Sequence, residues 1–246
     1  MNVHIQHINY IHEDAVHNMK APRAVVPIVM DLCRPKSVLD VGCGTGTWLK
    51  AFVENGVTDY YGVDGSDVAL SKLHILPEKF LKIDLSRPFD LRRKFDLAVC
   101  LEVAEHLPEN AADGLVASLV NHADTILFSA AIPGQGGQRH LNEQWPEYWE
   151  EKFSRRGYYF HDIIRQQIWN NESVDWWYKQ NMFIANRTAR QKHEMISVVH
   201  PEGFKAIHRS HDEMMDSLVQ GKQGMKIASK IFFRSLMFKV ASLFRQ

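Results

Sequence analysis

The stretch Val38-Leu39-Asp40-Val41-Gly42-Cys43-Gly44-Thr45-Gly46-Thr47-Trp48 places three glycines at alternate positions directly behind a short apolar run. Residues 37–42 have the composition of a buried strand, and residues 47–55 have the apolar spacing of a helix that ends before Gly56. A glycine turn between a strand and a helix lets the backbone approach a ligand closely, and the N–H groups at the start of the helix face that ligand. We therefore predict a ligand site at this turn.

The rest of the chain continues this alternation of strands and helices. Short apolar runs predict strands, and apolar residues spaced three to four apart predict helices. The predicted strands cover residues 59–65, 79–85, 94–103, 124–133, 158–165 and 181–187, and the predicted helices cover residues 66–75, 108–123 and 145–157. Apolar strands separated by helices indicate a parallel sheet covered on both faces, so the predicted fold class is α/β with a doubly wound sheet.

The composition limits the class of protein. Of the 246 residues, 45% are hydrophobic and 24% are charged, which is typical of a soluble globular protein. The first ten residues have neither the basic region nor the apolar core of a secretory signal. The three cysteines form no C-x-x-C pair, and the thirteen histidines form no H-E-x-x-H motif. We therefore expect a cytoplasmic protein with no disulfide framework, and we predict no metal ligands from these motifs.

The glycine pattern distinguishes between two classes of cofactor. A dinucleotide-binding turn has the pattern G-x-G-x-x-G/A, whereas Thr47 stands here where the third small residue belongs. The order apolar-Asp-x-Gly-x-Gly-x-Gly, from Asp40 to Gly46, instead resembles motif I of the class I S-adenosylmethionine (SAM)-dependent methyltransferases. This resemblance implies SAM as the cofactor and a Rossmann-like sheet of seven strands whose last strand is antiparallel.

The resemblance continues along the chain from about residue 20 to residue 187. It implies that Asp64 binds both ribose hydroxyls, that Asp84 lies near the adenine amino group, and that Glu102 lies beside the methionyl part. Asp40 is expected to hold the glycine loop through its N–H groups. An alternative for Asp84 is a cap on the turn before Pro88. The implied cofactor-binding residues are Asp40, Gly42, Cys43, Gly44, Gly46, Asp64, Gly65, Asp84, Leu85, Leu101 and Glu102.

Nucleic acid is not an expected partner. Methyltransferases that act on exocyclic amines of nucleic acid resemble one another in an Asn/Asp-Pro-Pro-aromatic motif after the fourth strand, where this chain has Cys100-Leu101-Glu102. Cytosine-carbon enzymes have a Pro-Cys nucleophile there, and this chain has Val99 before Cys100. Residues 1–216 carry no basic stripe of the kind that binds nucleic acid.

The segment 133–153 is the most individual part of the sequence. Polar residues and glycines surround a tryptophan, and residues 137–149 resemble bacterial methyltransferases associated with glycan and secondary-metabolite assembly. Five of the six tryptophans lie from Trp145 onward, and aromatic rings with polar edges suit a sugar or a ring-shaped acceptor. The predicted substrate-binding residues are Arg139, Asn142, Glu143 and Trp145.

We predict that the protein O-methylates a sugar hydroxyl on a glycan, a glycolipid or a glycosylated metabolite. A hydroxyl acceptor benefits from a general base, and His140 and His106 are the candidates, with His140 preferred because it lies among the acceptor-side residues. A small-molecule N- or C-methyltransferase is the alternative enzyme. A SAM-binding partner protein without turnover is the alternative from another class. Metal assistance at a sugar diol stays open, because it needs no recognisable motif.

The two ends of the chain differ from the body, and we divide the chain into 1–34, 35–190 and 191–246. Residues 12–34 have helical apolar spacing from Val25 to Leu32, and Pro22 and Pro27 are expected to split them into two short pieces. The resemblance implies that these pieces cover the SAM pocket, with His17 and Asn18 as residues that could reach the active site. Residues 217–246 contain six basic residues and no acid, which leaves the remainder at −6. Lys222, Lys226, Lys230 and Arg234 form one row on a helix beside bulky apolar residues, which predicts a basic amphipathic helix at an anionic membrane. Docking onto the acidic body and pairing in a homodimer are the alternatives.

Overall fold

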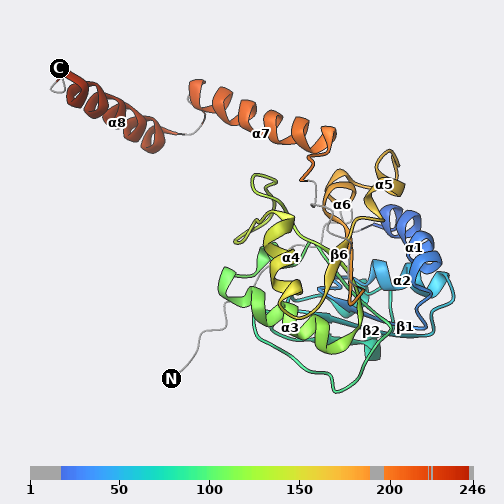
Figure 1. Cartoon of the computed structure of the whole chain (residues 1–246). Coiled ribbons are helices and arrows are strands. Elements are labelled where there is room, and N and C mark those ends of the chain that lie inside the picture. Colours follow the sequence, from blue (N-terminus) through green and yellow to red (C-terminus); the bar gives the residue numbers. More distant parts are fainter. Residues whose placement is uncertain (1–17, 189–196, 221, 223, 244–246) are drawn as a thin grey trace, which may run out of the picture. The chain divides into compact units, whose positions relative to one another are not determined.

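The computed structural model describes residues 18–188, 197–220, 222 and 224–243, and the chain divides into two compact units, 1–200 and 201–246 (Figure 1). His17 and the first part of the predicted N-terminal cap lie outside the described residues, as do residues 244–246 of the predicted tail helix. The first unit contains the sheet and the site, and the second consists of α7 (Pro201–Val219) and α8 (Met225–Leu243).

The first unit is built on one mixed sheet of seven strands in the order β3-β2-β1-β4-β5-β7-β6. The strands β1 to β5 run parallel, and β7 is antiparallel to both of its neighbours, β5 and β6. Their bounds are β1 (Ser37–Val41), β2 (Asp59–Asp64), β3 (Phe80–Lys82), β4 (Leu97–Leu101), β5 (Thr125–Ser129), β6 (Tyr159–His161) and β7 (Phe183–Asn186). The predicted Rossmann-like fold with an antiparallel last strand is therefore confirmed.

Side chains of successive strand residues point to opposite faces of the sheet. Both faces are buried, and each belongs to its own core cluster. Leu39, Ala98 and Phe128 belong to one core cluster with α3 (Ala112–His122) and α4 (Pro146–Ser154). Val38, Val99 and Leu127 belong to the other core cluster, together with residues of α1 (Lys20–Cys33), α2 (Thr47–Glu54) and α5 (Arg165–Ile168). Tyr178 of α6 (Trp176–Asn181) packs against this second cluster. Two packed faces explain why these strands are apolar throughout rather than alternating with polar residues.

Helix α1 corrects the prediction of two short N-terminal pieces. It is one helix that contains both Pro22 and Pro27. Pro22 lies in the first turn, where backbone N–H groups have no partner within the helix, so it costs little there. Pro27 removes one internal hydrogen bond, but Val25, Val26 and Val29 are fully buried on the same helix. Burial of three such side chains, at about 1.5 kcal/mol or more each, outweighs that loss.

The predicted helix 66–75 is also wrong. Only one 3-10 turn forms there, Leu70–Lys72. The backbone of this segment binds the glycine loop instead, since the His74 N–H donates to the carbonyl of Thr45 at 2.8 Å. Ile75 is buried against the same loop, where a Cβ on Gly46 would lie 2.9 Å from its side chain. These contacts with a distant segment prevail over the local helical spacing.

The second unit is helical, as predicted for the tail, and α7 adds a helix that the sequence did not predict. Within the described ranges, no helix combines the length and the hydropathy that a membrane crossing requires.

Candidate active site

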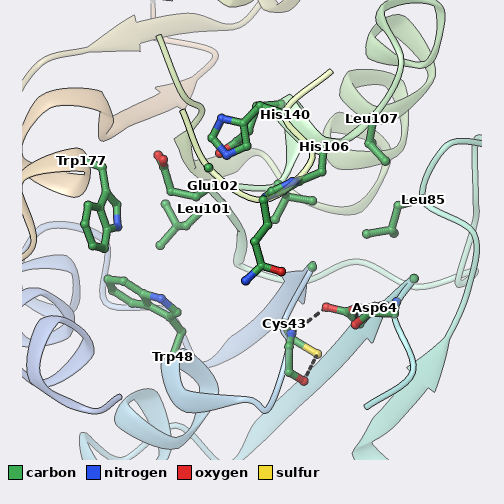
Figure 2. A pocket seen from close by; sticks show the side chains of 18 of the residues that line it. Cys43, Trp48, Asp64, Leu85, Leu101, Glu102, His106, Leu107, His140 and Trp177 are labelled. Carbon is green, nitrogen blue, oxygen red and sulfur yellow. Dashed lines mark hydrogen bonds between the residues drawn. The ribbon is translucent and has the colours of Figure 1, made fainter. Parts of the chain in front are cut away.

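The site is a cavity of about 580 Å³ at the carboxyl ends of the parallel strands. It lies where the strand order reverses between β1 and β4, the position at which open α/β sheets bind ligands. Figure 2 shows Cys43 and Asp64 at one end of the cavity, His106 and His140 at the other, and Trp48 and Trp177 along one side.

The glycine loop forms the floor of the cavity between β1 and α2. Gly42, Gly44 and Gly46 have φ values of +81°, +52° and +82°, a conformation that disfavours side chains. A Cβ on Gly42 would lie 2.3 Å from a methyl carbon of Val103, so glycine is also required for packing against the segment after β4. The loop therefore needs glycine both for its backbone and for its contacts.

Asp64 at the end of β2 holds this loop. Its Oδ2 accepts the Gly44 N–H at 2.7 Å, and its Oδ1 accepts the N–H and the hydroxyl of Ser66. The carboxylate is buried and lines the cavity. A fixed acid at the end of the second strand suits the ribose diol of a nucleoside ligand.

Asp40 has a different position from the one we predicted. Among the described residues its Oδ2 has no hydrogen-bond partner, and Asp64 takes the loop N–H that we assigned to it. It lies outside the cavity lining, as does Gly46. Burial, together with the charge of Asp64, raises the pKa of Asp40 to about 8.

Asp84 follows β3 and lines the cavity with Lys82, Ile83 and Leu85. Its Oδ1 also accepts the Ser86 N–H at 3.0 Å and the Ser86 hydroxyl at 2.6 Å. The turn-capping alternative is therefore present in the structure. A contact with adenine stays a prediction, and the position at the cavity is compatible with it.

Glu102 anchors a polar network at the end of β4. Gln135 donates its side-chain amide to one carboxylate oxygen at 2.7 Å, and Asn181 donates to the other at 3.2 Å. Asn181 also donates to the side-chain amide oxygen (Oε1) of Gln135 at 2.9 Å. Burial raises the pKa of Glu102. This network joins β4, the loop after β5 and the end of α6.

Beside this network lie Glu105 and His106, in the 3-10 turn Ala104–His106 that follows β4. Glu105 is fully buried, and within the described part of the chain neither of its carboxylate oxygens has a hydrogen-bond partner. Burial, and then the charge of Glu102, raises the pKa of Glu105 well above its usual value. Burial, and then the charge of His140, lowers the pKa of His106 to about 4, so this imidazole is neutral at neutral pH.

His140 reaches the same place from the loop after β5. Its ring contacts the ring of His106 edge to face, with 4.9 Å between centroids. Its Nδ1 lies 2.8 Å from Oε1 of Glu143, which orients the imidazole. The Leu141 N–H also donates to the Glu105 carbonyl at 2.7 Å, so the loop is tied to the turn that carries the other two residues.

The four predicted substrate-binding residues have other positions. Within the described residues none of them lines the cavity. Glu143 organises the loop, because it also accepts the Gly134 and Gly136 N–H groups at 2.7 and 2.8 Å. Asn142 is buried, Arg139 is exposed, and Trp145 is the exposed residue before α4. The loop residues at the cavity are instead Gln135, Gly136, Gly137, Gln138 and His140.

An aromatic wall completes the cavity, and the site prediction did not include it. It is formed by Trp48, Trp176, Trp177 and Tyr178. Trp48 and Tyr178 meet edge to face with 5.2 Å between centroids. The signal in the sequence was the tryptophan-rich segment after β6, but its distance from the glycine loop is decided by the fold alone. Trp48 belongs to the buried core and also lines the cavity.

Comparison with known proteins places this site in a family. A family model described as a methyltransferase domain matches residues 15–209. The magnesium protoporphyrin IX methyltransferase of Arabidopsis thaliana is 31% identical over 106 residues, which cover 39% of this chain and 33% of that protein. The ubiquinone biosynthesis O-methyltransferase of Nitrosomonas europaea is 36% identical over 102 residues, which cover 38% and 43%. The chain thus matches less than half of the length of either relative.

Two solved structures illustrate the similarity of the fold. DesVI of Streptomyces venezuelae gives a TM-score of 0.53 at 17% identity, over 73% of this chain and all of that one. The sugar N-methyltransferase KedS8 of Streptoalloteichus gives 0.52 at 17% identity, over 77% and 97%. At this identity the likeness concerns the fold. With the family model covering most of the chain, the protein belongs to the class I SAM-dependent methyltransferases, and S-adenosylmethionine is its cofactor.

Proposed function

We propose that the protein transfers a methyl group to a hydroxyl oxygen of a sugar or another ring-shaped acceptor. The observation that carries this proposal is the group formed by Glu105, His106 and His140 at the end of the cavity away from the glycine loop. A neutral amine attacks without such help, whereas a hydroxyl must lose its proton as it reacts. An enzyme for amines would gain little from collecting these residues.

The two ends of the cavity have different roles, since one binds SAM and the other binds the acceptor. Asp64 and the glycine loop hold the nucleoside and amino-acid parts of SAM at one end. When bound, SAM would supply a methyl carbon on a sulfonium. Transfer would form a bond from the acceptor oxygen to this carbon and break the C–S bond, whose electron pair would stay on sulfur. The hydroxyl proton would pass to the imidazole of His140 or His106. Most of the remaining task is alignment of the acceptor oxygen with that carbon.

The aromatic wall supports a ring-shaped acceptor. Trp48, Trp177 and Tyr178 border the cavity beside the polar group, and the ring faces of such residues pack against sugars and other planar acceptors. The names of the comparison proteins are compatible with a ring-shaped acceptor, since one is a ubiquinone biosynthesis O-methyltransferase and another a sugar N-methyltransferase. They include both oxygen and nitrogen chemistry, so the choice of oxygen rests on the polar group.

A methyl-transfer assay with tritiated SAM tests the proposal. The full-length protein is offered nucleotide sugars, glycans extracted from cells, phenols and amines in parallel, with Asp64→Ala at the same limiting SAM concentration as the control of weakened cofactor binding. We expect label in a product that survives acid and base, as a methyl ether does. Label in amines alone would replace the proposal with the N-methyltransferase alternative. SAM binding without turnover on any class would favour the non-catalytic partner.

A further inference from the structure

Glu105, His106 and His140 form a compact group of metal-ligating side chains. Each offers one ligand atom, and these atoms all lie within 4.8 Å of one another. Two of the residues are adjacent in the turn after β4, and the third comes from the loop after β5. Figure 2 shows the two imidazole rings side by side at the cavity.

The carboxylate of Glu105 lacks the partners that a buried acid needs. The side chain is fully buried, and both oxygens are without a hydrogen bond in the part of the chain that the structure describes. A buried carboxylate is costly unless it is paired, hydrogen-bonded or bound to a metal. Two imidazoles are its neighbours, and a cation held by all three residues would satisfy it.

The environment of His140 matches that of a metal-bound histidine. The carboxylate of Glu143 lies at its Nδ1, so this nitrogen carries the proton and Nε2 is left with its lone pair. A carboxylate behind the distal nitrogen is the usual second partner of a histidine that binds a metal. Gly137 makes room for this ring, because a Cβ there would lie 2.3 Å from Nε2.

We propose that Glu105, His106 and His140 bind a divalent first-row transition-metal cation at the acceptor end of the cavity. Two imidazoles and one carboxylate suit Mn²⁺, Fe²⁺ or Zn²⁺ better than Mg²⁺, which prefers oxygen ligands. Three ligands from the protein leave coordination positions open toward the cavity. Glu102 is not part of this set, since Gln135 and Asn181 occupy its oxygens. The prediction of no metal ligands from the sequence motifs is replaced by this proposal.

The role of the cation rests on the proposed function. A hydroxyl that binds a divalent cation loses its proton more readily, and the proton can then leave to water. An acceptor with two adjacent hydroxyls would fill two open positions at once. The cation would thus supply the activation that we first assigned to a histidine base.

Metal binding is tested without turnover. Mn²⁺ is titrated into the full-length protein, free of any histidine tag, by calorimetry and electron paramagnetic resonance. We expect one Mn²⁺ per chain and weaker binding of Mg²⁺. Loss of a residue that bonds to a metal ligand, as in Glu143→Gln, should lower Mn²⁺ affinity by roughly 10- to 100-fold. Loss of a ligand itself should lower it further, in each of Glu105→Gln, His106→Gln and His140→Gln.

The matched control is Glu109→Gln, an exposed acid four residues after Glu105, which should bind Mn²⁺ like the parent protein. SAM affinity, measured on every variant, shows that each remains folded. No saturable Mn²⁺ binding, or binding that survives the double change Glu105→Gln and His140→Gln, overturns the proposal. Methyl transfer that continues in chelator overturns the role of the cation and returns activation to a histidine. Site-specific Mn²⁺ binding in a protein that methylates only amines supports the site and rejects the oxygen acceptor.

Discussion

The backbone N–H of Gly44 donates to Oδ2 of Asp64 over 2.7 Å, and this bond joins the loop after β1 to the end of β2. One carboxylate thereby shapes the glycine loop and lies at the ribose end of the cavity. The acid nearest to the glycines in sequence, Asp40, does neither. The geometry of the cofactor site thus depends on a contact between residues twenty positions apart.

Asp64→Ala should weaken SAM binding about tenfold or more. The change removes a buried charged acceptor, and each hydrogen bond to such a group contributes about 1.5–3 kcal/mol. Calorimetry with SAM measures the effect. Asp59→Ala, at the half-buried start of the same strand and outside the cavity lining, should bind SAM like the parent protein. Equal affinities for the two variants would remove Asp64 from the cofactor site.

Asp40 should make the protein less stable as pH rises from about 4 to about 8. Its pKa is about 8 in the folded protein, whereas an unfolded Asp has a pKa of about 3.9. Between these values the unfolded chain has released the proton that the folded chain keeps, so each pH unit favours unfolding by at most about 1.4 kcal/mol from this residue. Asp40→Asn removes the titrating group.

Urea unfolding of both proteins at pH 5 and pH 8.5 checks this expectation. The stability of Asp40→Asn relative to the parent should increase from the lower to the higher pH. The comparison between the two proteins cancels the contributions of other buried acids. A constant difference across this range would show that Asp40 is ionised in the folded protein.

His140→Gln should lower turnover about a hundredfold and leave SAM affinity unchanged. The imidazole lies at the acceptor end of the cavity, away from Asp64 and the glycine loop. The effect is expected whether His140 holds a cation or removes the proton itself. His208→Gln on α7 is the control, since this histidine bonds only within its own helix in the structure described. Full activity of His140→Gln would show that another group activates the acceptor hydroxyl.

Gly137→Ala should reduce both turnover and Mn²⁺ affinity, because a methyl group there would collide with the His140 imidazole at 2.3 Å. Gly134→Ala is the matched control in the same loop. Its φ of +86° costs about 1 kcal/mol with a side chain, but no atom lies within 4 Å of the added carbon. If both variants lose function equally, loop strain rather than the position of His140 is responsible.

Deletion of residues 222–246 should abolish binding to anionic vesicles. Lys230 and Arg234 are exposed on α8, together with the apolar side chains of Phe232, Phe233 and Met237. Each basic group near an anionic surface contributes about 1 kcal/mol. Sedimentation of both forms with phosphatidylserine vesicles at low salt measures this. A full-length protein that stays in the supernatant rejects the membrane proposal, and a change in oligomeric state on deletion would favour pairing.

The sequence by itself determined the fold, the family and the cofactor. Each of these depends on local patterns: a short apolar run such as 37–41 predicts a buried strand, and the glycines from Gly42 to Gly46 allow a backbone that other residues disfavour. The spacing from these glycines to Asp64 is also local, because one helix and one strand separate them. Such features need no knowledge of distant contacts.

Only the tertiary structure decided which side chains meet. Residues 66–75 have helical spacing, yet their backbone binds the glycine loop. Arg139, Asn142 and Trp145 have suitable chemistry for an acceptor, yet they do not line the cavity that Trp48 and Trp177 border. Glu105, His106 and His140 come together because the loop after β5 folds back and bonds to the carbonyl of Glu105. A side chain's partner is set by segments far away in the sequence, and no local pattern specifies their register.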